Sequence, residues 1–396
     1  MSKSLVVFVW ENFGPVHSDR CDALALRLGD RRKVIGVELG GSSVVYDWRP
    51  EDGAHFEKRT LFEGVSIDDV SNWRKFTTLL KTCFGLRPAD FFFCHYETPH
   101  VFMTALLLRL TGSRVFVMND SKFDDYRRYV GRELIKKLFY LPYNGAMAAG
   151  ARSADYFRFL GLPARQIVLN YDALSTDRIR RLAGVDRAPG GPPFAERDFI
   201  IVARMIAKKN IGMALEAYAL YRAASAAPRK LRLCGSGPLE QELRAQAERL
   251  GVADMVVFHG FLQIEEVCPL LGSSLALILP SLQEQFGNVV IEAQALGLPV
   301  IVSDNCGARD LLVRNGVNGF VVEPDNPQGL AFFMGLLDRD EALWRRMSLA
   351  TGPFSALGDA SRFAQSALEL MGDRDRERGF AQLANAPAEN SIADRL

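Results

Sequence analysis

Two glutamates eight positions apart, Glu284 and Glu292, stand on either side of a Phe-Gly-Asn tripeptide. The surrounding stretch, residues 280–297, leaves an apolar run, turns at Gly287 and enters a helical pattern. Backbone amides in such a turn have no partner within the helix and carry partial positive charge, so they suit a diphosphate. The loop glutamate can then face a sugar while the helix glutamate meets ribose hydroxyls. The bare spacing is more typical of two solvated side chains, but its place at a strand-to-helix turn favours a binding site.

Two cations five positions apart, Arg204 and Lys209, follow another apolar run at residues 199–203. At the carboxyl end of a strand, fixed cations can neutralise a departing diphosphate in place of a metal ion. Each charge-assisted hydrogen bond contributes about 1.5–3 kcal/mol, against about 0.3–1 kcal/mol for a helix terminus. The side chains should therefore matter more than the helix dipole. Lys208 could take the place of Lys209, and ordinary surface ion pairs are the alternative explanation.

A weaker signal is the turn Gly235-Ser236-Gly237, which follows the apolar run 230–234 and opens another helical pattern. Glycines at such a turn let the main chain approach a nucleotide closely. A plain turn explains the same residues equally well, so this segment supports a nucleotide site only beside the other two.

The elements that must position these residues are short apolar runs separated by helical patterns. Helical connections force neighbouring strands to be parallel, and uninterrupted apolar runs indicate strands covered on both faces. Ligands of such doubly wound sheets bind beyond the carboxyl ends of the strands. The runs lie at residues 5–10, 33–37, 91–94 and 114–118 in the first half, and at 199–203, 230–234, 255–259, 275–279 and 300–303 in the second.

The segment most like a linker reads Ala-Pro-Gly-Gly-Pro-Pro at residues 188–193. It cannot extend a helix and has little to bury, so we place a domain boundary there. The expected division is a domain at 1–182, a linker at 183–197, a second domain at 198–352, a helical segment at 353–372 and a disordered polar tail at 373–396.

The composition indicates a soluble, globular chain of 396 residues, with 48% hydrophobic and 24% charged residues and a net charge of +1. That balance gives no field that would draw the protein onto nucleic acid. No apolar run reaches the roughly 18 residues of a spanning helix, so we expect a cytoplasmic protein. The six cysteines and five histidines show no metal-ligand spacing, so we expect neither a metal site nor another cofactor.

Taken together, these motifs resemble those of glycosyltransferase family 4, whose signature is Glu, seven residues, Glu in this setting. The resemblance covers residues 199–335 in its motifs and the first half only in general layout. It implies an α/β chain of the GT-B type, with two Rossmann-like domains whose parallel sheets face an interdomain cleft. The acceptor would lie mainly on the first domain and the donor on the second. The helix within 353–372 would cross back to the first domain.

In the second half, the resemblance assigns donor contacts to the motif residues. Glu284 would touch hydroxyls of the donor sugar, Glu292 would bind the nucleotide ribose, and the pair Arg204 and Lys209 would stabilise phosphate charge. The main-chain amides that would face the sugar and diphosphate belong to Phe286, Gly287 and Asn288.

In the first half, the agreement is partial. Gly14 matches one glycine of a pair that the family commonly carries after the first strand. Asn119 stands where the family often has a histidine that contacts the donor sugar, and it could hydrogen-bond a hydroxyl instead. His17, in the loop at 11–18, and His95 complete the candidates for the acceptor or sugar side.

The resemblance therefore implies a retaining, metal-independent glycosyltransferase. It would move a sugar from a UDP or GDP sugar to a glycan or lipid-linked acceptor in the assembly of cell-surface polysaccharide or glycoconjugates. A sugar phosphorylase, a nucleotide-sugar epimerase or a non-catalytic sugar-binding protein would share the architecture. A dinucleotide oxidoreductase is disfavoured, because no Gly-x-Gly-x-x-Gly follows the first strand.

The stretch 126–140 combines five basic residues with leucines, an isoleucine, a phenylalanine and tyrosines in a helical pattern. A basic amphipathic helix of this kind can lie on an anionic bilayer and bring an enzyme to the inner face of the membrane. An ordinary surface helix with its apolar side buried fits the same pattern, because nearby acidic residues offset some of the charge.

Overall fold

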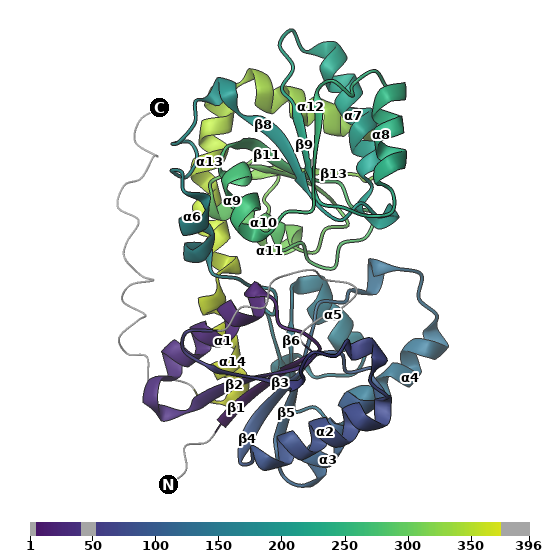
Figure 1. Cartoon of the computed structure of the whole chain (residues 1–396), viewed down its shortest axis with the longest axis vertical. Helices are drawn as coiled ribbons and strands as arrows, with labels where there is room; N and C mark the ends of the chain where they lie inside the picture. The colour runs from purple at the N-terminus through teal and green to yellow at the C-terminus, as the bar shows by residue number, and fades with distance from the viewer. Residues whose placement is uncertain (1–4, 41–52, 374–396) are drawn as a thin grey trace.

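A computed structural model describes residues 5–40 and 53–373. They form two α/β layers, each with a sheet of parallel strands, that are stacked end to end (Figure 1). The first sheet has the strand order β3-β2-β1-β4-β5-β6-β7 and the second β10-β9-β8-β11-β12-β13. Within the described residues, the strands of both sheets pair in parallel, which confirms the predicted fold class. We call the two layers, with their helices, the first and second domains.

The strands of the first sheet are β1 (Leu5–Trp10), β2 (Lys33–Gly40), β3 (Glu57–Phe62), β4 (Ala89–Phe93), β5 (Arg114–Asn119), β6 (Gly145–Ala148) and β7 (Ile167–Val168). Those of the second are β8 (Asp198–Val202), β9 (Leu231–Cys234), β10 (Val256–Gly260), β11 (Ser274–Leu279), β12 (Val300–Ser303) and β13 (Gly319–Val322). The helices of the first domain are α1 (Pro15–Leu28), α2 (Asn72–Gly85), α3 (Pro99–Leu110), α4 (Val130–Tyr140) and α5 (Ala151–Phe159). The remaining helices are α6 (Thr176–Ala183), α7 (Ile211–Ala224), α8 (Glu240–Arg249), α9 (Ile264–Gly272), α10 (Val289–Ala295), α11 (Arg309–Leu312), α12 (Pro327–Arg339), α13 (Glu341–Ser355) and α14 (Ala360–Met371).

Each sheet is covered on both faces, which is why its central strands read as unbroken apolar runs. All six residues of β11 are buried. Four strands escaped prediction: β3 and β13, which lie at sheet edges, and β6 and β7, which are short. In β3 the charged letters Glu-Lys-Arg hide the strand pattern, because an edge strand exposes part of its surface to water.

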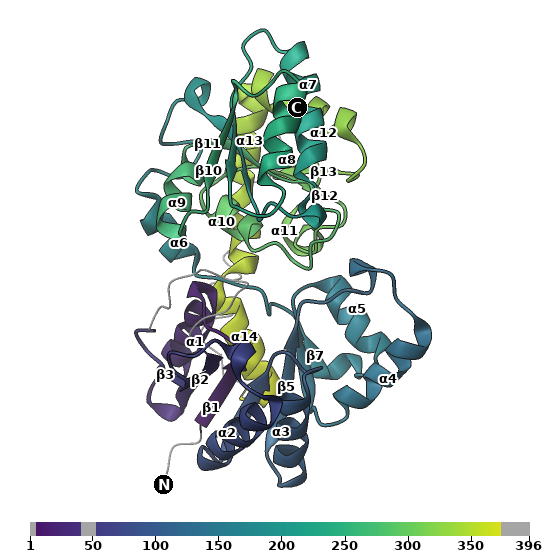
Figure 2. The same cartoon turned by 45° about the vertical axis from the view of Figure 1, so that its right-hand side comes forward.

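The strand order reverses beside β1 in the first sheet and beside β8 in the second. Loops that leave neighbouring strands in opposite directions open a crevice at the carboxyl ends of the strands. The carboxyl ends of the two sheets face each other across the middle of the molecule (Figure 2). The segments after β5, β8, β9 and β11 therefore meet in this region.

The chain passes between the domains twice. The first passage comes just before α6, which packs on α9 and α10 of the second domain. The second comes before α14, which packs on α1 of the first domain. The two passages touch each other, because Leu174 pairs with Asp359 and the Thr176 hydroxyl donates to the Asp359 carboxylate over 2.8 Å.

The segment expected to link the domains, 183–197, instead packs onto the second domain. Ala188 is buried in the core of that domain, and Arg197 donates to the carbonyls of Gly272 and Ser274. The segment follows α6, so it lies beyond the first passage between the domains. Its prolines and glycines exclude helix, but they do not prevent the segment from covering a hydrophobic surface. The predicted tail beyond Asp373 lies outside the described residues.

Candidate functional site

A cavity of about 480 Å³ lies between the domains, within the size range typical of small-molecule sites. Nine of the predicted residues line it, and they come from three separate segments of the second domain: Arg204, Lys209, Gly235, Ser236, Glu284, Phe286, Gly287, Asn288 and Glu292. Lys208 lines it as well. Five predicted residues do not line it: Gly14, His17, His95, Asn119 and Gly237.

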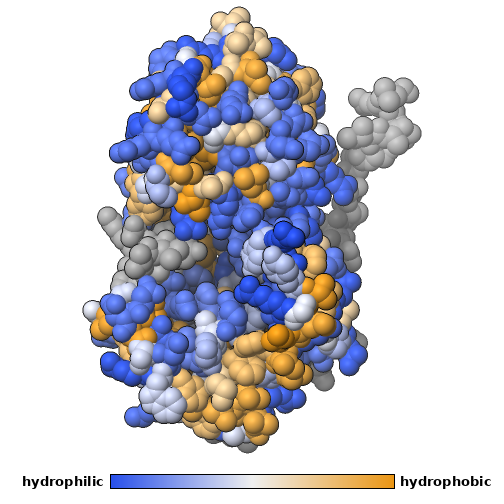
Figure 3. Space-filling model, turned by 90° about the vertical axis from the view of Figure 1, so that its right-hand side faces the viewer, coloured by the Kyte–Doolittle hydropathy of each residue, from blue (hydrophilic) through white to orange (hydrophobic). Residues whose placement is uncertain are grey.

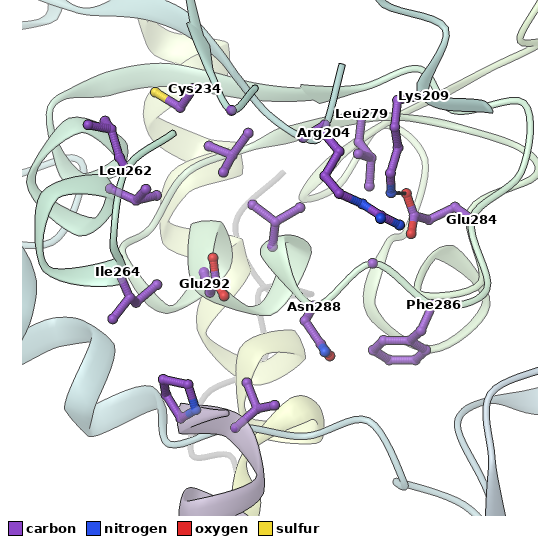
Figure 4. Close-up of a pocket in the computed structure, with 18 of the residues that line it drawn as sticks. Arg204, Lys209, Cys234, Leu262, Ile264, Leu279, Glu284, Phe286, Asn288 and Glu292 are labelled. Atoms are coloured by element: carbon purple, nitrogen blue, oxygen red, sulfur yellow. Dashed lines mark hydrogen bonds and ion pairs between the residues drawn. The ribbon is translucent and has the colours of Figure 1, made fainter. Parts of the chain in front are cut away.

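Lys209 and Glu284 form the polar centre of the cavity. The Lys209 ammonium lies 2.5 Å from a carboxylate oxygen of Glu284, which also accepts from the Ser281 hydroxyl over 3.0 Å. Arg204 extends toward the same carboxylate from the neighbouring strand end (Figure 4). The two loops are tied together by Asn210, which donates to the carbonyl of Pro280 over 3.1 Å. The predicted cations and the loop glutamate therefore converge on one point.

Lys208 is held differently from Lys209. Its carbonyl accepts from the amide of Leu282 over 2.8 Å, so its main chain fastens the two loops together. Burial, followed by the neighbouring Lys209 charge, lowers the pKa of its ammonium. Both lysines face the cavity, and within the described residues it is Lys209 that forms the ion pair with Glu284.

The turn after Glu284 is fixed by close packing of the main chain. Gly287 has φ +104, and a Cβ there would lie 3.0 Å from Leu279 and 3.3 Å from the sulfur of Cys306. The amide of Ala308 donates to the carbonyl of Phe286 over 2.8 Å. Glycine is thus required at the turn, and the path of the chain past the cavity is set before any ligand binds.

The turn Gly235-Ser236-Gly237 supports the loop that carries Arg204. A Cβ on Gly235 would lie 2.0 Å from the carbonyl oxygen of Ala203, and one on Gly237 would lie 2.5 Å from that of Met205. The amide of Met205 donates to the carbonyl of Ser236 over 2.8 Å. Gly237 therefore lies outside the cavity lining, where it allows the loop after β9 to pack closely against the loop after β8.

Glu292 lies in the first turn of α10, and its carboxyl group faces the cavity (Figure 4). Burial raises its pKa to about 7, while the Arg178 charge opposes that rise and the Asp19 charge adds to it. Arg178 is on α6 and pairs with Asp19 of α1 over 2.7 Å. The sequence did not single out Arg178, because it is remote from the motifs along the chain.

The first domain supplies two carboxyl groups that the sequence analysis missed, Asp120 and Asp172. Burial, together with the charges of Asp172 and Asp125, raises the pKa of Asp120 to about 7. Asp172 is buried and paired with Arg20 over 2.9 Å. Asp120 directly follows β5, so its position at a strand's carboxyl end was the signal that could have identified it.

The predicted residues of the first domain lie outside the cavity lining. The Asn119 side chain accepts from the amide of Ser121 over 2.9 Å, which leaves Asp120 to face the cavity. A ring nitrogen of His17 accepts from the amide of Gly14 over 2.9 Å at the start of α1. Burial lowers the pKa of that imidazole, so it is held neutral. His95 follows β4 with φ +54, at a turn outside the cavity lining.

Two cations of the first domain grip the second domain across the cleft. The buried Lys122 ammonium donates to the carbonyl of Glu284 over 3.0 Å and pairs with Asp125 over 2.6 Å. Arg152 on α5 lies 2.6 Å from the carboxylate of Asp310 and also donates to the carbonyl of Cys306. The loop that carries Glu284 is therefore held from both domains.

The donor set of the site is built from cations, carboxyl groups and main-chain amides. In the described parts of the chain, no three His, Cys, Asp or Glu side chains gather as a metal ion would require. At the cavity, the side-chain oxygen of Asn288, like Oδ2 of Asp172, is buried without a hydrogen-bond donor within residues 5–40 and 53–373. A ligand that carries hydroxyl groups would satisfy it. Among the same residues, no helix has the length and apolar character needed to cross a membrane.

Comparison with known proteins places the similarity mainly in the second domain. Residues 185–348 match the family model described as Glycosyl transferases group 1. The D-inositol 3-phosphate glycosyltransferase of Streptomyces griseus is 38% identical over 117 residues, which are 29% of this chain and 25% of the relative. The provisionally named colanic acid biosynthesis glycosyltransferase WcaL of Salmonella typhimurium is 30% identical over 184 residues, 45% and 43% of the two chains. The chain thus spans less than half the length of these curated relatives.

Solved structures resemble most of the chain. Anabaena HepE, solved in complex with UDP and glucose, has 16% identity and a TM-score of 0.69, covering 93% of this chain and all of that one. Sucrose-phosphate synthase from Thermosynechococcus elongatus has 17% identity and a TM-score of 0.69, over 93% and 98% of the two chains. The lipopolysaccharide outer core galactosyltransferase WaaB, in its apo form, has 15% identity and a TM-score of 0.66, over 93% and 99%. At such low identity these matches establish a common fold.

Proposed function

Because this chain belongs to the group 1 glycosyl transferases through its second domain and has the GT-B fold, we propose that it is a retaining, metal-independent glycosyltransferase with a nucleotide diphosphate sugar as donor. One observation carries the proposal: four charged residues predicted from separate motifs, Arg204, Lys209, Glu284 and Glu292, line a single cavity at the carboxyl ends of the strands. Retention of the anomeric configuration is carried over from the family resemblance.

The donor diphosphate lies against Arg204, Lys209 and the amides of the turn at Gly287. As the bond between sugar and phosphate breaks, negative charge grows on the leaving diphosphate. Fixed cations stabilise that charge without moving, which is the role a metal ion fills elsewhere. Helix α10 has only seven residues, so its dipole adds less than the two side chains.

Glu284 receives hydroxyl groups of the donor sugar. Its carboxylate is held by Ser281 and Lys209, and the main chain around it is fixed by Lys122. A sugar held at this point would have its phosphate beside Lys209, because the ammonium lies 2.5 Å from the carboxylate. Glu292 receives the ribose hydroxyls, and the oxygen of Asn288 accepts from a further hydroxyl group.

The acceptor binds against the first domain, where Asp120 and Asp172 face the cavity. Carboxyl groups are suitable partners for the hydroxyls of a glycan or of a lipid-linked glycan. WcaL and WaaB are named for colanic acid and lipopolysaccharide, and we propose a related role for this chain in assembling surface polysaccharide or glycoconjugate at the inner face of the membrane. UDP is the proposed nucleotide, because HepE was solved with UDP.

The test is a thermal-shift screen of nucleotide sugars on the purified protein, followed by product analysis with and without acceptor glycans. We expect a UDP sugar to raise the melting temperature, slow donor hydrolysis without acceptor, and a glycosylated product with it. A product that needs inorganic phosphate would indicate a phosphorylase, and an altered nucleotide sugar formed without acceptor would indicate an epimerase. Binding without any turnover would indicate a sugar-binding protein, and each of these outcomes would reject the proposal.

A further inference from the structure

Helix α4 is turned so that Glu133 and Lys136 face the protein. Glu133 is buried, its carboxylate accepts from the Tyr156 hydroxyl, and it lies near the charges of Arg128 and Lys136 at 3.6 and 3.4 Å. A buried carboxylate is costly unless it is paired and hydrogen-bonded, so this network fixes the rotation of the helix. The side chains on the opposite face must then point to solvent.

That opposite face is apolar. It consists of one exposed stripe, which we call the α4 face: Val130, Leu134, Ile135, Leu138 and Leu141. These side chains are between 53% and 73% exposed. Eight of the 22 exposed large apolar side chains in the described residues fall within 123–141, so the stripe is a local concentration. An ordinary surface helix buries its leucines, so this one is inverted.

Exposed aromatic rings extend the α4 face on its N-terminal side. Tyr126 and Tyr129 precede the helix, and Phe123 packs edge-on against Phe159 with ring centroids 5.3 Å apart. Viewed from the side on which α4 lies in Figure 1, apolar side chains gather over the lower domain (Figure 3). Contiguous apolar surface of this kind marks an interaction site.

The surroundings of the face are basic. Arg127, Arg132 and Lys137 form no ion pair with an acidic residue of the described chain, and the guanidinium of Arg127 and ammonium of Lys137 lie over aromatic rings. The acidic residues nearby are engaged, because Asp124 pairs with Arg152 and Asp125 with Lys122. An apolar stripe with a positive rim is complementary to a layer of acyl chains beneath anionic headgroups.

We propose that the α4 face docks on an anionic lipid bilayer and lies there parallel to the membrane surface. The reason for such docking rests on the proposed function, because a lipid-linked acceptor would remain in the bilayer while its sugar enters the cleft. The cavity and α4 are close together along the chain: Asp120 lines the cavity, Lys122 contacts Glu284, and α4 begins at Val130. Docking at α4 therefore places the acceptor side of the cleft near the headgroups.

The experiment is sedimentation of the full chain with large vesicles of phosphatidylcholine, with and without phosphatidylglycerol. We expect binding to the anionic vesicles that weakens as salt is raised, because the basic rim is screened. The variant Leu134→Ser with Leu138→Ser should bind at least about tenfold more weakly, since each leucine side chain contributes through burial of apolar surface. The matched control, Leu220→Ser with Leu349→Ser, removes two exposed leucines of the second domain and should bind as the parent does.

Donor hydrolysis in the absence of vesicles separates this proposal from the proposed function. Leu134→Ser with Leu138→Ser should hydrolyse donor at the parent rate, since neither leucine lines the cavity. Equal vesicle binding by both double variants, or no binding to anionic vesicles at low salt, would overturn membrane docking whatever the enzyme does. Sedimentation velocity gives one more decisive outcome. If the parent protein forms a dimer but does not bind vesicles, and the double variant Leu134→Ser with Leu138→Ser is a monomer, the α4 face would be assigned to a second copy of the chain.

Discussion

The two walls of the cleft differ in how their residues are distributed along the chain. The wall from the second domain is built largely from short motifs, with Arg204 close to Lys209 and Glu284 close to Glu292. The wall from the first domain is built from a few residues on distant segments, namely Pro15 with Val16, Asp120 and Asp172. A motif of fixed spacing therefore describes the wall from the second domain, whereas the wall from the first domain has no local sequence pattern. Under the proposed function, this contrast would suit a second domain that binds the same nucleotide diphosphate group throughout and a first domain that adapts to different acceptors.

The largest expected effect tests whether the second-domain wall carries the chemistry. Lys209→Ala should lower the kcat/KM for the donor about 10²- to 10³-fold, because it removes a fixed cation from the leaving diphosphate. Steady-state kinetics of donor hydrolysis or transfer would measure it. Lys230→Ala, at an exposed lysine of the same domain, is the matched control. Turnover at the parent level in Lys209→Ala would contradict the assignment.

The second largest effect tests whether a first-domain residue, Lys122, positions Glu284 of the second domain. Lys122→Met leaves Asp125 buried without its cation, which should lower the free energy of unfolding by about 3–5 kcal/mol. Adding Asp125→Leu should recover much of that stability in chemical denaturation. If Lys122 positions Glu284, the stable double variant should still use donor more slowly than the parent. Full recovery of both stability and turnover would show that Lys122 only neutralises Asp125.

Glu292→Gln should raise the KM for the donor about tenfold, since a charged hydrogen-bond acceptor for ribose is lost. The pKa of about 7 also predicts a pH dependence. The unfolded chain releases this proton near pH 4.5 and the folded chain near pH 7, so burial of Glu292 lowers the stability as pH rises through that window. Glu292→Gln should remove this part of the fall. Melting curves of both proteins at pH 5 and pH 8 would measure the difference, and parallel falls would contradict it.

The smallest effect belongs to the first-domain wall. Asp120→Asn should raise the KM for the acceptor about three- to tenfold and leave the KM for the donor unchanged, because one hydroxyl partner is altered on the acceptor side. Two-substrate kinetics separate these constants. Asn119→Ala is the natural control, since that side chain serves the backbone of Ser121. A change confined to the donor KM would move Asp120 to the other ligand and weaken the contrast between the walls.

The sequence predicted the fold well because parallel strands covered on both faces are unbroken apolar runs. β1, β11 and β12 lie where those runs indicated. Edge strands such as β3 mix charged and apolar letters, so the same rule could not reveal them. The passage between the domains was misplaced because a segment rich in proline and glycine looks like a linker even when it packs against a core, as Ala188 and Arg197 do.

The residues of the site also divide into those that the sequence could reveal and those that it could not. Glu284, Glu292, Arg204 and Lys209 could be singled out because each lies near another member along the chain. Their roles in catalysis remain proposals, which the variants above test. Asp120 and Asp172 become neighbours only through the tertiary fold, so no spacing pointed to them. The orientation of α4 was equally hidden, since it depends on where Tyr156 lies relative to Glu133.

The pairing of Leu174 with Asp359 has a mechanical consequence. Two connections that touch each other behave as a single short hinge, so the domains can swing about that line but are resisted in twisting. Lys122 and Arg152 hold the second domain, and α5, which carries Arg152, lies across the first domain from the passage into α14 (Figure 2). Points farthest from a hinge travel farthest, so the first bonds to break on opening would be the ones that hold the Glu284 loop. Opening of the cleft and loosening of the Glu284 loop would then be one motion.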